Sequence, residues 1–203
     1  MRGIDRGRYV AGGVQLALAG FLTASHAVTT APFVYPHYVA LILLHPWIVR
    51  RITGVRLRPW LIVWISVPLF VHPIGGLYGF YADVWWYDKV AHFASATVVA
   101  GIGYIVGRAA HRNGLFPVAP RYTVAAFTML FVMSAGVLWE TVEEWTPLLT
   151  VYGPNDTFWD YVFDAVGGLT VVALGPWLLD RQARGLEEAV EDGLAGRSDD
   201  GGE

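Results

Sequence analysis

Six apolar stretches separated by short polar seams account for most of this chain. A helix needs about 20 residues to cross the hydrocarbon core of a bilayer, and most of the stretches approach or exceed that length. We therefore predict six membrane-spanning helices, near residues 9–28, 34–49, 60–80, 89–107, 122–146 and 158–179. The predicted fold class is an all-α membrane protein, a bundle of about six transmembrane helices.

Basic residues gather in alternate seams of this pattern. Arginines precede the first span, fill the second and fourth seams and follow the sixth span, whereas the other three seams share one basic residue, Lys89. Cytoplasmic loops of membrane proteins carry an excess of Lys and Arg. We therefore expect a multi-pass protein of the cell membrane with both termini cytoplasmic. An alternative for the first span is a cleaved signal peptide, because a small-residue "SHA" (residues 25–27) follows its apolar run.

Composition agrees with this class. The chain is 55% hydrophobic and only 15% charged, which is untypical of a soluble domain, and it offers no support for nucleic-acid binding. It contains no cysteine, which excludes disulfides and thiol chemistry. Seven acidic residues fall within residues 185–203. We predict a transmembrane domain over residues 1–180 and an acidic, disordered cytoplasmic tail over residues 181–203.

Ionisable side chains within the spans concentrate at the predicted outer ends of the last three. Each of these helix ends presents polar residues about one turn apart: Asp88 and His92, then Glu140, Glu143 and Glu144, then Asp160 and Asp164. A carboxylate at mid-span costs about 2.5 to 3.5 kcal/mol, less near the interface. Such residues are functional candidates by default, and several together need protons, a cation or basic partners.

Depth divides these residues into two tiers. With a rise of about 1.5 Å per residue, His92 lies about 5 Å inside its span, and Glu140 and Asp164 about 9 Å. We predict these three as an inner tier of metal ligands. The outer tier comprises Asp88, Glu143, Glu144 and Asp160.

Structural roles compete with a site at several positions. Asp88 is a candidate helix N-cap, and "TFWD" (Thr157–Asp160) reads as a capping box. Glu143 and Glu144 also fit an ordinary hydrated helix end. His92 is alternatively a hydrogen-bonded packing residue.

Three segments of the second half of the chain resemble the VanZ-like family of small membrane proteins. They are "DKVAHF" (residues 88–93), "ETVE" (140–143) and "DYVFDAVG" (160–167). Asp164 departs from the family pattern, in which many relatives carry Asn, and this adds a negative charge. The resemblance implies a multi-pass fold and a polar site but no reaction.

The leading hypothesis is an outer-face site that binds a divalent cation, a lipid phosphate headgroup, or both. Carboxylates with one imidazole suit Mg²⁺, Mn²⁺ or Zn²⁺. Lys89 is predicted to reach a polyprenyl-linked or phospholipid phosphate from the rim of the site. If the protein is an enzyme, metal-assisted hydrolysis or transfer on such a lipid is the expected reaction class. The alternatives are a proton- or cation-coupled transporter and a non-catalytic membrane assembly protein.

Overall fold

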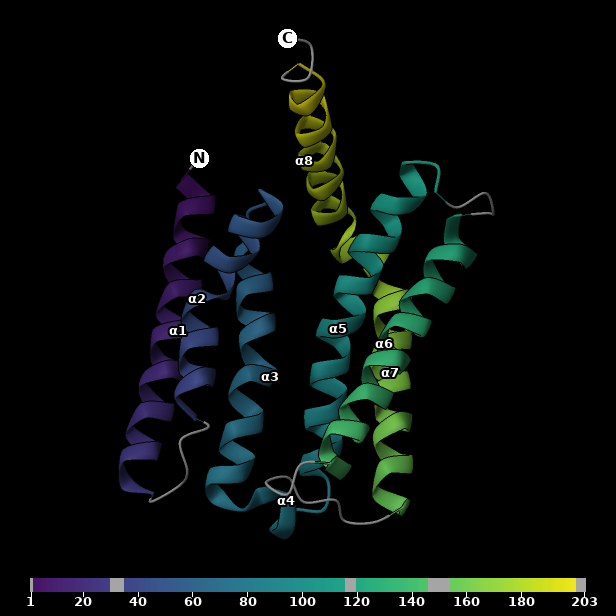
Figure 1. The fold of residues 1–203 in the computed structure, drawn as a ribbon. Coiled ribbons are helices and arrows are strands. Elements are labelled where there is room, and N and C mark those ends of the chain that lie inside the picture. Colours follow the sequence, from purple (N-terminus) through teal and green to yellow (C-terminus); the bar gives the residue numbers. More distant parts are fainter. Residues whose placement is uncertain (1, 30–34, 116–119, 146–153, 200–203) are drawn as a thin grey trace. The chain divides into compact units, whose positions relative to one another are not determined.

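A computed structural model of the chain describes residues 2–29, 35–115, 120–145 and 154–199. Within these ranges it contains helices and no strand, which confirms the all-α prediction (Figure 1). A helix satisfies its backbone hydrogen bonds internally, as a bilayer requires. The elements are α1 (Arg2–Val28), α2 (Tyr35–Thr53), α3 (Pro59–Tyr78), α4 (Phe80–Asp83), α5 (Tyr87–Arg112), α6 (Pro120–Trp145), α7 (Pro154–Leu178) and α8 (Asp180–Asp199).

Five segments of these helices are long and apolar enough to cross a membrane. They are Arg6–Val28, Pro59–Tyr78, Tyr87–Arg112, Tyr122–Trp145 and Asn155–Leu178. Each coincides with one of the predicted spans. Helix α2 occupies the place of the second predicted span but is not among these segments; it contains two histidines and has Arg50 and Arg51 in its last turn. The expectation of six spans is therefore confirmed for five.

The side chains of the second half of the chain are distributed as a bilayer demands. Large apolar groups face outward, and the exposed fraction is 69% for Leu130, 67% for Leu138 and 78% for Trp177. Charged groups such as Glu140 and Asp160 are buried instead, with 5% and 2% exposed. Large apolar side chains exposed in this way are expected on a surface that contacts lipid tails.

The chain forms two compact units, Met1–Ala91 and His92–Glu203. In the first, α1, α2 and α3 pack against one another (Figure 1). The core of this unit contains Ala19, Leu22, Ile42 and Ile74. The buried amide of Gln15 donates to the carbonyl oxygen of Ile42, so this interior polar group has a partner.

The first turn of α5 is tied to α3 within the first unit. Helix α3 ends at Tyr78 because Gly79 adopts a left-handed backbone conformation, with φ of 71°, that glycine accepts without steric cost. The short helix α4 follows. The hydroxyl of Tyr87, the first residue of α5, donates to the carbonyl oxygen of Val71 at 2.7 Å. This bond anchors the turn that carries Asp88.

In the second unit, two adjacent glycines of α7 allow close packing on both sides. A Cβ atom at Gly167 would lie 2.8 Å from Cβ of Ala96 and 3.0 Å from the carbonyl oxygen of Phe93, both on α5. A Cβ atom at Gly168 would lie 2.8 Å from Cγ1 of Val132 on α6. Helix α7 therefore approaches α5 through one glycine and α6 through the next, as small residues allow in membrane bundles.

The segment expected to be a disordered tail instead forms helix α8 as far as Asp199. Its first residue, Asp180, accepts hydrogen bonds from Nε of Arg108 at 2.9 Å and from Nη2 of Arg112 at 3.1 Å. Nη1 of Arg112 donates to Oε2 of Glu187 at 3.1 Å. These ion pairs join α8 to the end of α5, and one of them uses Glu187, an acidic residue of the stretch that suggested disorder.

The orientation of the spans stays a prediction, and cysteine labelling tests it without background because the chain has no native cysteine. The positions are Asp83, Asn113 and Asn155, all of them exposed. In intact cells, an impermeant maleimide should label Asp83→Cys and Asn155→Cys but not Asn113→Cys. The third variant should react only after permeabilisation, because positively charged seams stay in the cytoplasm. The reverse pattern would contradict the orientation.

Candidate metal site

Asp88 and His92 lie in the first two turns of α5. The helix begins at Tyr87, so Asp88 is inside its first turn and the N-cap interpretation is wrong. A carboxylate in a first helical turn is still favoured by the helix dipole. The four-residue spacing places His92 above Asp88 on the same helix face. His92 is buried, with 5% of its surface exposed, and Asp88 is half-buried.

Asp160 and Asp164 come from α7, which begins earlier than the sequence suggests. The predicted start is residue 158, whereas the helix begins at Pro154, and proline suits a first helical position. Asp160 therefore lies inside the helix, about 9 Å from its start, and its capping-box interpretation is wrong. Both carboxylates are buried, with 2% of Asp160 and 5% of Asp164 exposed.

The imidazole of His92 lies between the two aspartates of α7. Its Nδ1 atom is 3.4 Å from Oδ1 of Asp164, and its Nε2 atom is 3.9 Å from Oδ1 of Asp160. All three side chains are at most 7% exposed. Each ring nitrogen therefore faces a different carboxylate, and both carboxylates come from one face of one helix.

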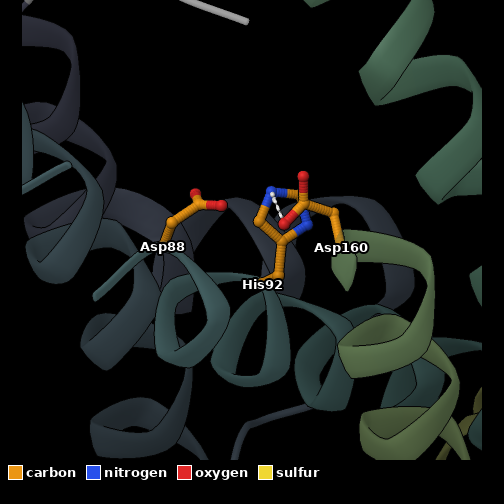
Figure 2. A group of neighbouring side chains, drawn as sticks. All are labelled: Asp88, His92 and Asp160. Atoms are coloured by element: carbon orange, nitrogen blue, oxygen red, sulfur yellow. Dashed lines mark ion pairs between the residues drawn. The ribbon is translucent and has the colours of Figure 1, made fainter. Parts of the chain in front are cut away.

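Asp88, His92 and Asp160 form a group that could hold one metal ion. Each offers a ligand atom, and these atoms lie within 4.8 Å of one another. Figure 2 shows Asp88 and His92 on the same helix with Asp160 approaching from α7. Two ligands on one ion, each at about 2.1 Å, lie roughly 3 to 4 Å apart, so the site needs only a small contraction. The boundary between the two compact units, after Ala91, falls inside α5. Asp88 and His92 therefore belong to one continuous helix although they are assigned to different units.

This group differs from the predicted inner tier of His92, Glu140 and Asp164, since it combines His92 with two residues of the predicted outer tier, Asp88 and Asp160. Helix α7 begins four residues earlier than predicted, so Asp160 lies about 9 Å from its start, the distance predicted for Asp164. Asp164 instead contacts the opposite ring nitrogen of His92. Its Oδ2 atom also lies 2.5 Å from where a Cβ atom would stand at Gly136 of α6.

The polar residues of α6 lie at different depths. Glu140 is buried, with 5% exposed, and stands one turn after Gly136, on the α6 face that borders Asp164. Glu143 is half-buried and Glu144 is exposed, the gradient of an ordinary hydrated helix end. Lys89, in the first turn of α5, is half-buried. A ligand role for Glu140 or Glu143 and a headgroup role for Lys89 stay predictions.

The charges of this region favour a cation. Asp88, Asp160 and Asp164 surround one imidazole, which carries at most one positive charge. Buried like charges repel and lose their hydration, so the group needs a counter-charge or bound protons. A divalent ion between Asp88, His92 and Asp160 would supply the counter-charge and bind all three side chains.

A family model for predicted membrane proteins, DUF2238, matches residues 9–181. The chain belongs to this family. The resemblance to the VanZ-like family is therefore wrong. The segments behind it are short, and an acid and a histidine four residues apart suit any membrane helix that presents a polar pair on one face.

A relative from Thermotoga maritima, described as an uncharacterized protein, is 26% identical over 135 residues. The alignment covers 64% of this chain and 68% of the relative. No solved structure matches the chain. Membership of DUF2238, a family of predicted membrane proteins, thus agrees with the membrane fold.

Proposed function

We propose that this DUF2238 protein binds a divalent metal ion through Asp88, His92 and Asp160. The observation that carries the proposal is the convergence of three ligand atoms within 4.8 Å at the start of α5 and in α7, on side chains of which two are buried. Placing charged groups inside a membrane bundle is costly, and ion binding offsets that cost. By the arginine distribution, this end of the bundle faces the outside of the cell.

The donor set restricts the choice of ion. Two carboxylate oxygens and one imidazole nitrogen suit Zn²⁺ or Mn²⁺, whereas Mg²⁺ prefers oxygen ligands and retains several waters. Three protein ligands also leave at least one coordination position open, as in catalytic rather than structural zinc sites. An exogenous oxygen ligand can occupy that position.

We propose a phosphate oxygen of a lipid headgroup as this further ligand. The site lies near the membrane surface, where such headgroups are concentrated. Lys89 belongs to the same helical turn as Asp88, and its long side chain can reach the headgroup level. The metal and the ammonium group would then both bind the phosphate.

The proposed function predicts stoichiometric metal binding by the protein purified in detergent. Equilibrium dialysis followed by elemental analysis should find one Zn²⁺ or Mn²⁺ per chain. Asp160→Asn keeps the size of the side chain but removes a charged ligand, so affinity should fall at least about 100-fold, more than for loss of an outer-shell partner. The matched control is Glu144→Gln, an exposed carboxylate, which should bind like the wild type. Absence of binding by the wild type, or equal binding by Asp160→Asn, would reject the site.

The lipid part of the proposal is tested on the same metal-loaded protein. A short-chain phosphatidic acid should bind more tightly than inorganic phosphate, and Lys89→Gln should weaken this binding while metal content stays unchanged. Lys89→Arg, which preserves the charge, should retain most of it. If Lys89→Gln binds the lipid like the wild type, Lys89 is a structural counter-ion and the headgroup role is rejected.

A further inference from the structure

Asp164 of α7 is a buried carboxylate beside His92 that the metal-binding group does not include. It contacts His92 on Nδ1, at 3.4 Å, on the opposite side of the ring from the Nε2 atom that faces Asp160. Only 5% of its surface is exposed, so bulk water does not solvate it well. A charge placed at this depth is costly, and a hydrogen bond to a metal-binding histidine would account for its presence.

We propose that Asp164 is a positioning residue that orients His92 so that Nε2 is the metal-binding nitrogen. This proposal rests on the metal site of the proposed function and adds the residue that sets the orientation of its histidine. A neutral imidazole carries one N–H, and a carboxylate beside Nδ1 holds that hydrogen there as its acceptor. The lone pair of Nε2 then faces Asp160 and the ion. Metal-bound histidines commonly use such a carboxylate on the second nitrogen.

The packing of α6 against α7 holds Asp164 in this position. Gly136 of α6 has no side chain, and the space where its Cβ would stand lies 2.5 Å from Oδ2 of Asp164. Any larger residue at position 136 would collide with the carboxylate. Gly136 therefore supplies the space in which Asp164 fits.

Orientation by Asp164 has a consequence for metal preference. A carboxylate hydrogen-bonded to Nδ1 makes the imidazole a stronger donor through Nε2. Ions that accept imidazole readily, such as Zn²⁺ and Co²⁺, gain from this, whereas Mg²⁺ gains little because it prefers oxygen. Asp164 thus favours binding of transition metals over Mg²⁺.

Asp164→Asn and Gly136→Ala test this inference by two independent routes. The first removes the charge of the acceptor, and the second displaces the carboxylate while leaving His92, Asp160 and Asp164 unchanged in sequence. Both should weaken Zn²⁺ binding about 10- to 100-fold without reducing the number of sites. Both should also shift the visible absorption bands of Co²⁺ bound in place of Zn²⁺, and Mg²⁺ competition should become more effective. Gly13→Ala is the matched control, because a Cβ there meets nothing within 4 Å.

The outcomes separate this inference from the proposed function. If the wild type binds no metal, the proposed function fails. If the wild type binds Zn²⁺ and both variants keep its affinity and its Co²⁺ spectrum, the metal site stands and the positioning role of Asp164 is overturned. If Asp164→Asn removes binding as completely as Asp160→Asn, Asp164 is a direct ligand, which also overturns the inference. Circular dichroism and gel filtration confirm that each variant is folded.

Discussion

Replacing Gly167 with valine should lower the unfolding free energy by about 3 kcal/mol and weaken metal binding at the same time. A Cβ atom there would lie 2.8 Å from Cβ of Ala96, 3.0 Å from the carbonyl oxygen of Phe93 and 3.2 Å from the amide nitrogen of Thr97. Two of these three atoms belong to the backbone of α5 and cannot rotate away. Helices α5 and α7 must therefore separate, and His92 and Asp160 separate with them.

Thermal denaturation in detergent, followed by circular dichroism, measures the loss of stability, and Zn²⁺ dialysis measures the effect on the site. Gly13→Val is the control, because it makes the same chemical change in α1 where there is open space. This control corrects for the higher helix propensity of valine relative to glycine. If Gly167→Val denatures at the same temperature as Gly13→Val, α5 and α7 do not pack through Gly167.

Replacing Asp180 with asparagine should lower the unfolding free energy by about 1.5 to 3 kcal/mol at neutral pH. The carboxylate accepts hydrogen bonds from Tyr104 at 3.2 Å, from Arg108 at 2.9 Å and from Arg112 at 3.1 Å. Asparagine leaves the guanidinium group of Arg108 without this counter-charge and leaves Arg112 paired with Glu187. Because the same ion pairs hold the start of α8, limited proteolysis of α8 should also become faster.

The effect of Asp180→Asn should depend on pH. Burial alone raises the pKa of Asp180, but the hydrogen bond and charge of Arg108, with contributions from Tyr104 and Arg112, outweigh it and leave the pKa below its usual value of 3.8. The stabilising contribution of Asp180 is therefore complete above the unfolded-state pKa and is lost as pH falls through the lower folded-state pKa. The difference in melting temperature between wild type and variant should be constant near neutral pH and should shrink below about pH 4.

Glu188→Gln provides the matched control for this prediction. Glu188 also belongs to α8 but is exposed, and its neutralisation should change the melting temperature little. Equal melting temperatures for Asp180→Asn and Glu188→Gln at neutral pH would mean that the ion pairs of Asp180 contribute no net stability. A difference that persists unchanged below pH 4 would contradict titration of the carboxylate as its cause.

The sequence was sufficient to predict the features that depend on contact with lipid and on the repeat of the helix. Apolar runs located the long helices, and four-residue spacing placed Asp88 with His92 and Asp160 with Asp164. The exact depth of each residue was less accessible, because it depends on where a helix begins. Helix α7 begins at Pro154 rather than at the predicted residue 158, so Asp160 lies well inside the helix, and the group that could hold a metal includes Asp160 and not Asp164.

Features made by distant partners were not visible in the sequence. Residues 181–203 read as an acidic, disordered tail, because their composition does not reveal the contacts that Arg108 and Arg112 make with α8. Those partners of Asp180 lie 72 and 68 residues earlier in the chain. The contact of Asp164 with Nδ1 of His92 is likewise long-range, and helix period alone cannot say which ring nitrogen faces which carboxylate. Gly136, one turn before Glu140, was the feature of the sequence that could have indicated this contact, because a residue without a side chain leaves room for a carboxylate of a neighbouring helix.

The turn of α5 that contains Asp88 and His92 also contains Lys89, and this has a use in chemical labelling. Lys89 is the one lysine of the chain, so an amine-directed reagent has a single side-chain target. A fluorophore or spin label attached there would stand between the first and second residues of the metal-binding group in sequence. The protein thus carries, without engineering, a unique attachment point for a reporter beside its candidate site.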